Sequence, residues 1–180
     1  MTLLDKDNQP LQGERLQRHI ERALAVTSIP HNRDVKIAWQ IVQRLFRPVV
    51  RGVDNIPPQP CLFVGNHSLF ALDGLVVATI MHQRYNRFLR PLGDKFLFTH
   101  PALEQALLAR GAAMGHPDVC SALMAHGQDL LVFPGGAHEA VKPSRQRYQL
   151  QWKERYGFIR MAAEHGYTIM PFGIVGPDEF

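Results

Sequence analysis

A histidine and an aspartate follow the first buried apolar run of the chain at a spacing that permits a catalytic dyad. His67 comes three residues after the run 61–64, and Asp73 follows six residues later. A carboxylate that hydrogen-bonds one imidazole nitrogen fixes the tautomer and leaves the other nitrogen as a general base. Six residues of regular helix turn two side chains about 240° apart, so the dyad forms only if His67 precedes the helix. The alternative is a capping His67 and an Asp73 that is merely polar.

A second loop combines glycines with ionisable side chains. After the apolar run 130–133, the chain continues with Pro134, Gly135, Gly136, Ala137, His138 and Glu139. Paired glycines let backbone N–H groups approach a ligand and form a nest for an anion, although tight turns need the same residues. Open α/β sheets bind ligands at the carboxyl ends of their strands. We therefore expect this loop and the His67 loop to lie at one site.

Short apolar runs alternate with helical segments, which predicts an α/β fold: a largely parallel or mixed central sheet with flanking helices. Strands are expected at 61–64, 88–92, 112–114, 130–133 and 167–174. Helices are expected at 69–83, 101–110, 117–126 and 154–165.

Two further helices, 12–26 and 34–47, are expected before this region. The predicted organisation is therefore an N-terminal helical segment over 1–47 and a main domain over 48–180. The run 167–174 is so near the end of the chain that the domain either ends there in a terminal strand or is truncated.

Composition excludes several classes of protein. With 46% apolar and 20% charged residues, the chain of 180 residues has the make-up of one globular domain. Its two cysteines, Cys61 and Cys120, exclude a disulfide scaffold and indicate a reducing compartment. The nine histidines show no metal-ligand spacing, so no metal is expected. Apolar stretches are shorter than the about 18 residues of a membrane span, and charges interrupt the N-terminus where a signal peptide has its apolar run.

Charge is modest in sum, at +4, but uneven in placement. Six basic residues and one acid occupy 142–160. Such a segment is a solvated flank, or it meets anionic lipid or the phosphates of a cofactor. Few aromatic residues accompany it, so nucleic acid is the weakest candidate partner.

The helix expected at 34–47 is amphipathic. Its apolar stripe consists of Val35, Trp39, Val42 and Phe46. A stripe of this kind either packs on the core or lies on a membrane surface.

Together the two loops resemble the glycerolipid acyltransferase superfamily. The likeness rests on Gly-Asn-His67 with its downstream Asp73 and on Phe-Pro-Gly-Gly-Ala-x-Glu139-Ala, and it covers roughly residues 35–176. The Pro-Gly-Gly-x-x-Glu motif is similar to the diacylglycerol acyltransferase-like branch. Two departures stand out. His67 and Asp73 enclose five residues, one more than the commonest spacing in the superfamily. The Pro-Glu-Gly-Thr-Arg motif of the phosphate-acceptor branch is replaced by Pro-Gly-Gly-Ala-His at residues 134–138.

The resemblance implies an O-acyltransferase that needs no cofactor and takes its acyl group from acyl-CoA or acyl-carrier protein. His67 would accept the proton of an acceptor hydroxyl, and Asp73 would orient His67. Substrate-binding positions implied by the resemblance and by the basic segment are Asn66, Pro134, Gly135, Gly136, His138, Glu139, Lys142 and Arg145.

The missing phosphate-binding motif favours an uncharged lipid acceptor such as diacylglycerol. A lysophosphatidate or glycerol-phosphate acceptor, a thioesterase and a non-catalytic lipid-binding module are the alternatives. The implied location is cytoplasmic, with peripheral contact at the inner membrane surface and no nucleic-acid partner.

Overall fold

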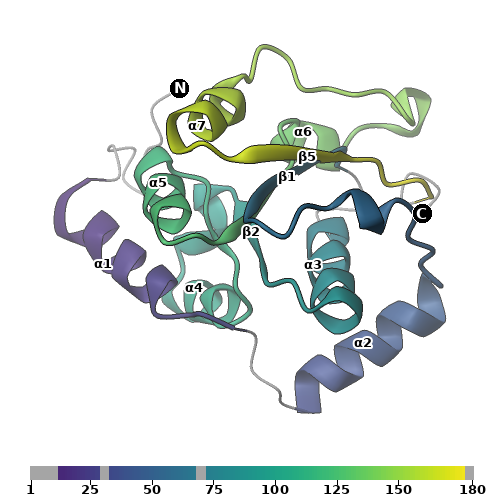
Figure 1. Ribbon diagram of the computed structural model, residues 1–180, viewed down its shortest axis with the longest axis horizontal. Coiled ribbons are helices and arrows are strands. Elements are labelled where there is room, and N and C mark those ends of the chain that lie inside the picture. The colour runs from purple at the N-terminus through teal and green to yellow at the C-terminus, as the bar shows by residue number, and fades with distance from the viewer. Residues whose placement is uncertain (1–11, 29–32, 68–71, 177–180) are drawn as a thin grey trace.

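The computed structural model describes residues 12–28, 33–67 and 72–176 (Figure 1). Its centre is a sheet made of β1 (Cys61–Gly65), β2 (Leu89–Gly93), β3 (Ala113–Met114), β4 (Asp129–Val132) and β5 (Thr168–Phe172). The strand order is β3-β2-β4-β1-β5, and each of these pairings is parallel. The α/β class is therefore confirmed.

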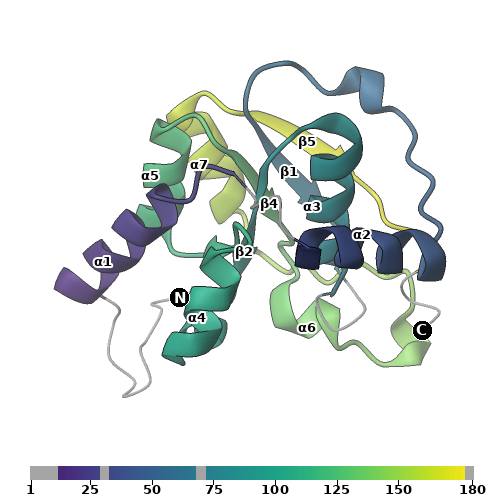
Figure 2. The ribbon, with the colours of Figure 1, turned by 90° about the horizontal axis from the view of Figure 1, so that it is seen from below.

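Helices cover both faces of the sheet (Figures 1 and 2). They are α1 (Gly13–Leu24), α2 (Arg33–Leu45), α3 (Leu72–Tyr85), α4 (Pro101–Leu108), α5 (Pro117–Ala125), α6 (Gly136–Ala140) and α7 (Gly157–His165). Short 3-10 turns, η1 (Val53–Asn55), η3 (Lys95–Phe98) and η4 (Ser144–Gln146), complete the described elements.

Two hydrophobic cores lie on opposite faces of the sheet because successive strand residues point to opposite sides. Leu62 and Val64 of β1 join the core that α1, α4, α5 and α7 cover. Cys61 and Phe63 join the core that α3 covers. The run 61–64 is thus buried on both sides, as a central parallel strand requires.

The predicted elements agree with the observed ones to within a few residues, with one omission. Residues 136–140 of the glycine loop form α6, where the sequence predicts only a turn. The N–H of Gly136 donates to the carbonyl of Phe133 at 2.9 Å, which closes the turn that starts this helix. Residues 69–71 of the helix predicted at 69–83 lie outside the described residues.

A buried arginine fastens α1 to the sheet. Arg90 of β2 has no exposed surface. Its guanidinium donates to the carbonyls of Ala23 and Val26 at the end of α1, at 2.9 Å each, and also to Gln128. Burial lowers the pKa of Arg90 to about 10, so the side chain stays charged at neutral pH. The end of α1 is therefore tied to the same core as the strands.

The apolar stripe of α2 packs on α3. Val42 is buried, and Trp39 is half-buried with the Arg84 guanidinium 5.2 Å from its ring centroid. The other side of α2 exposes Ile37, Ile41 and Leu45, by 45, 49 and 68%. Within the described residues, none of the helices has the length and apolar character that crossing a bilayer requires.

Candidate active site

The structure brings His67 and Asp73 together. His67 lies in the loop after β1, and Asp73 lies in the first turn of α3, so the histidine precedes the regular helix. Nδ1 of His67 is 2.9 Å from Oδ1 and 3.0 Å from Oδ2 of Asp73. Oδ1 also accepts the N–H of Gly74 at 2.8 Å, which holds the carboxylate in place. A carboxylate only accepts hydrogen bonds, so Nδ1 carries the proton and Nε2 is left as an acceptor.

The His67 imidazole is largely buried and packs against an aromatic ring. The His67 side chain is 10% exposed and stacks on Phe133, with centroids 4.3 Å and planes 10° apart. No described residue hydrogen-bonds to Nε2, and Nε2 is not one of the described buried atoms that lack a partner. The geometry therefore presents one unoccupied basic nitrogen at the carboxyl edge of the sheet.

Two glycines permit the ring packing around the dyad. A Cβ on Gly65 would collide with the ring of Phe172, and a Cβ on Gly74 would lie 3.1 Å from the ring of Phe133. Phe172 and Phe133 meet edge to face, with centroids 6.0 Å apart. Close packing of the Phe172 ring therefore requires glycine at position 65.

Asn66 uses its side-chain amide within the protein. Its Nδ2 donates to the carbonyl of Ile174 at 2.9 Å, and its Oδ1 accepts the N–H of Ile174 at 2.7 Å. This pair ties the end of β1 to the segment after β5. Asn66, predicted to bind substrate, is thus placed to support the loop that carries His67.

Glu139 joins the glycine loop to the dyad. It has no exposed surface, and its Oε1 accepts the N–H of Gln151 at 3.4 Å, while Oε2 has no hydrogen-bond partner among the described residues. Burial raises the pKa of Glu139, against smaller lowering effects of the Gln151 N–H, of the Lys142 charge and of nearby His67. A Cβ on Gly135 would collide with this carboxyl group. The two predicted loops therefore meet, as expected, through a buried carboxyl group.

An arginine from a distant part of the chain clamps the glycine loop. Nη1 of Arg155 donates to the carbonyl of Pro134 at 3.2 Å and to that of Gly135 at 3.0 Å. A Cβ on Gly136 would lie 2.6 Å from the same nitrogen. The sequence identifies Arg155 only as part of a basic segment, because no local spacing links it to residues 134–136.

The two glycine N–H groups differ in availability. The Gly136 N–H is used in the turn with Phe133, whereas the Gly135 N–H has no hydrogen-bond partner among the described residues. The expected nest is thereby reduced to one available glycine donor.

The remaining predicted substrate-binding residues are exposed or half-buried. His138 and Arg145 are exposed, and Lys142 is half-buried with its Nζ donating to the carbonyl of Gln149 at 3.5 Å. In the described part of the chain, no group of three or more His, Cys, Asp or Glu side chains is placed to hold a metal ion.

Comparison with known proteins places both loops in one family match. The sequence model of a family described as Acyltransferase matches residues 47–175. Phytyl ester synthase 2 (chloroplastic) of Arabidopsis thaliana is 30% identical over 141 residues, which cover 73% of this chain and 20% of that protein. The DGAT1/2-independent enzyme synthesizing storage lipids of Gallus gallus is 30% identical over 122 residues, which cover 68% of this chain and 36% of that protein. The chain thus spans only a minor part of these relatives. No solved structure matches it.

Proposed function

The chain belongs to the acyltransferase family, and we propose that it transfers a fatty acyl group from acyl-CoA or acyl-carrier protein to the hydroxyl of an uncharged lipid alcohol. Its relatives include a phytyl ester synthase and an enzyme synthesizing storage lipids, by their names. The observation that carries the proposal is the His67–Asp73 pair, with Nδ1 held 2.9 Å from the carboxylate and no described residue hydrogen-bonded to Nε2.

In the proposed reaction, Nε2 of His67 accepts the proton of the acceptor hydroxyl while the oxygen attacks the thioester carbonyl carbon. A C–O bond forms, and the carbonyl oxygen takes the negative charge. Asp73 stabilises the imidazolium that results. When the C–S bond breaks, the leaving thiolate takes the proton from Nε2. The products are the ester and the free thiol, and no side-chain nucleophile is required.

The Gly135 N–H is our candidate donor to the developing oxyanion. In a trans peptide, the C=O and N–H bonds point in opposite directions. Arg155 holds the carbonyl of Pro134, which belongs to the same peptide unit as the Gly135 N–H. Arg155 therefore fixes the direction of that N–H. A preorganised backbone donor of this kind stabilises charge that develops in the transition state.

An uncharged acceptor fits the composition of the loop. Gly135 and His138 stand where the resemblance places glutamate and arginine in enzymes with phosphate acceptors. The similar proteins are named for a phytyl ester and for storage lipids. We propose diacylglycerol or a phytol-like alcohol as the acceptor.

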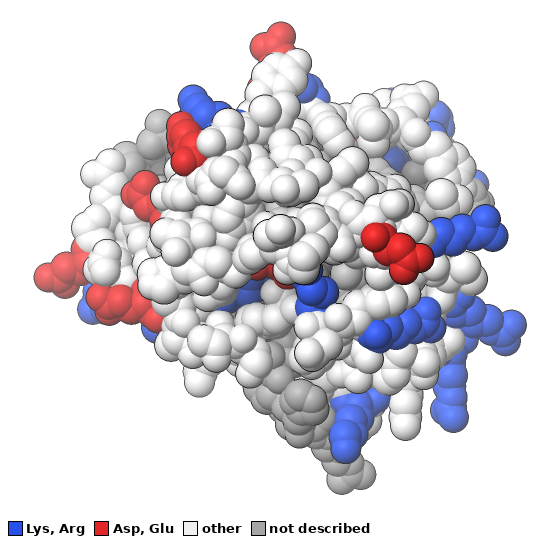
Figure 3. Space-filling view, viewed as in Figure 1, with Lys and Arg blue, Asp and Glu red and all other residues white. Residues whose placement is uncertain are grey.

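We further propose that α2 contacts the inner surface of a membrane. Ile37, Ile41 and Leu45 recur every four residues and form an exposed apolar stripe. Lys and Arg side chains gather on the side of the molecule where α2 lies (Figure 3), and α2 itself carries Lys36 and Arg44. Apolar residues flanked by cations suit the boundary between acyl chains and anionic headgroups.

The proposal is tested by release of free CoA from palmitoyl-CoA in mixed micelles, with and without diacylglycerol or phytol. We expect release to require the alcohol and to fall about 10²–10⁴-fold in His67→Ala. Release without an alcohol would identify a thioesterase. Full activity of His67→Ala would remove His67 from the mechanism.

A further inference from the structure

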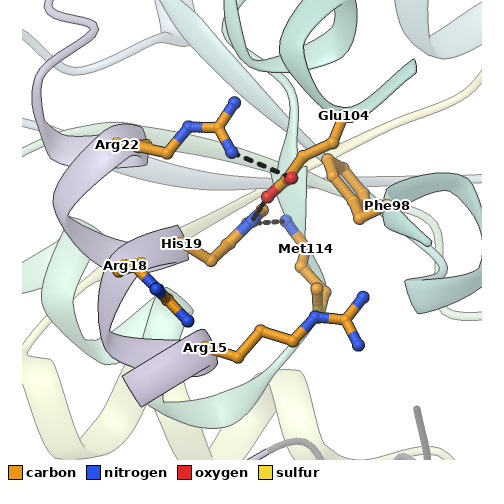
Figure 4. A pocket seen from close by; sticks show the side chains of 7 residues that line it. All are labelled: Arg15, Arg18, His19, Arg22, Phe98, Glu104 and Met114. Carbon is orange, nitrogen blue, oxygen red and sulfur yellow. Dashed lines mark hydrogen bonds and ion pairs between the residues drawn. The ribbon is translucent and has the colours of Figure 1, made fainter. Parts of the chain in front are cut away.

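A cavity lined by arginines lies apart from the dyad, beside α1 (Figure 4). It encloses about 170 Å³. Its lining includes Arg15, Arg18, His19, Arg22, Glu104 and Met114. The arginines come from residues 15–22, outside the region 47–175 that matches the family. The cavity is therefore built partly by a segment to which the family match assigns nothing.

The charge around this cavity is predominantly positive. Among the described lining residues, three guanidinium groups accompany one carboxylate, that of Glu104, whose Oε2 accepts Arg22 Nη1 at 2.9 Å. Arg15, Arg18 and Arg22 recur at intervals of three and four residues, so they share one face of α1. A positive surface of this kind suits a negatively charged ligand.

His19 adds rigidity to the cavity and no charge. Its Nδ1 donates to Oε1 of Glu104 at 2.7 Å, and its Nε2 accepts the N–H of Met114 at 3.2 Å. A protonated ring could not accept the second bond. Burial lowers the pKa of His19, against the raising effect of Glu104, which agrees with a neutral ring. The histidine joins α1, α4 and β3 and leaves the binding of anions to the arginines.

The cavity and the dyad lie at the same edge of the sheet. Met114 ends β3 as Gly65 ends β1, and the strands are parallel. β2 and β4 lie between them, so about three strand spacings of roughly 4.8 Å separate the two strand ends. In coenzyme A, the extended pantetheine arm separates the phosphates from the thioester. One acyl-CoA molecule is suited to reach both places.

We propose that the arginine cavity binds the phosphate groups of coenzyme A while the thioester lies at His67. This step rests on the acyl-CoA donor of the proposed function. Guanidinium groups bind phosphate through paired hydrogen bonds. The basic segment 142–160 is a weaker candidate, since Arg155 is bonded to loop carbonyls and Lys142 to the carbonyl of Gln149.

Titration calorimetry of the full chain with coenzyme A tests the proposal through two variants that should change Kd in opposite directions. Arg18→Ala should raise Kd about tenfold, as expected for one lost charged contact. Glu104→Gln should lower Kd, because it removes the negative charge and keeps a carbonyl oxygen for Nδ1 of His19. Structural damage would weaken binding in both variants. The control Arg110→Ala removes an exposed arginine outside the cavity lining and should leave Kd unchanged.

Unchanged coenzyme A affinity in Arg18→Ala overturns the proposal, as does a loss confined to Arg145→Ala of the basic segment. Binding to phosphatidylglycerol vesicles separates the other source of phosphate. If Arg18→Ala weakens vesicle binding alone, the cavity takes a lipid headgroup and the proposal fails. Ester formation with an unaltered acyl-CoA KM in Arg18→Ala refutes only the cavity assignment. Weakened coenzyme A binding in that variant, with no ester formed by the wild type, refutes only the enzyme function.

Discussion

Two buried histidines of the described residues, His67 and His19, hydrogen-bond carboxylates through Nδ1, and they differ at Nε2. Nδ1 of His67 lies 2.9 Å from Asp73, and its Nε2 has no hydrogen-bond partner among the described residues. His19 lies 2.7 Å from Glu104, and its Nε2 accepts the Met114 N–H. A histidine paired with a carboxylate is therefore a candidate base in the His67–Asp73 pair and a structural bridge in the His19–Glu104 pair. Availability of the second nitrogen decides between them.

The largest expected effect comes from neutralising each carboxylate in turn. Asp73→Asn should lower kcat about 10²–10⁴-fold, because the amide neither stabilises the imidazolium nor enforces the tautomer. The same change at the other pair, Glu104→Gln, should act on the donor KM instead of kcat. Steady-state kinetics with palmitoyl-CoA as the varied substrate measures both. Equal losses of kcat would erase the distinction between the pairs.

A smaller effect on kcat is expected from removing Arg155, whose side chain holds the glycine loop. Arg155→Ala should lower kcat roughly tenfold, since it loosens the peptide unit that carries the Gly135 N–H, whereas complete loss of an oxyanion donor costs about 10²–10³-fold. Arg160→Ala, an exposed arginine on α7, serves as the matched loss of charge. If both variants keep wild-type kcat, the hydrogen bonds of Arg155 to the glycine loop do not contribute to turnover.

The His19–Glu104 pair should make the free energy of unfolding depend on pH. The neutral form of His19 is favoured in the folded state, so its pKa is lowered there. As the pH falls below the usual value of about 6.5, the unfolded chain takes up the proton first. The free energy of unfolding then falls, by less than about 1.4 kcal/mol per pH unit. Above that pH, His19 contributes no slope.

Urea denaturation between pH 7.5 and 5.5 measures this contribution as the difference between wild type and His19→Gln. We expect a flatter profile in the variant. Identical slopes would show that His19 is not held neutral.

The smallest effect is expected on membrane binding by α2. Ile41→Ser removes an exposed apolar side chain of α2 and should weaken liposome co-sedimentation several-fold, which corresponds to about 1 kcal/mol of lost burial. Arg18→Ala should leave co-sedimentation unchanged, because its cavity is assigned to the acyl donor. The opposite pattern would place α1, and not α2, on the lipid surface.

Sequence reasoning found the pair that we propose as catalytic because its partners are close in the chain. His67 and Asp73 are six residues apart, directly after a strand that is recognisable by its apolar run. His19 and Glu104 are 85 residues apart, and only the packing of α1 beside α4 joins them. The strands and most helices follow from apolar periodicity and from proline and glycine at their ends, which are local signals.

The support around the site depends on tertiary contacts that no local pattern encodes. Arg155 reaches a loop 20 residues earlier, and Asn66 bonds Ile174, 108 residues away. On α2, periodicity identified the apolar stripe of Trp39 and Val42, but it did not show that this stripe faces α3. The membrane contact is therefore now proposed for the opposite side of the helix.

The most direct test of the role of His67 compares His67→Gln with His19→Gln in one preparation, with kcat measured at saturating palmitoyl-CoA and Tm measured in parallel. We expect His67→Gln to lose about 10²–10⁴-fold in kcat with little change in Tm. We expect His19→Gln to lower Tm, because the buried N–H of Met114 loses its ring acceptor, while the folded variant still turns over. A His67→Gln variant with wild-type kcat, or equal losses of kcat in both variants, would contradict the assignment of His67 Nε2 as the base.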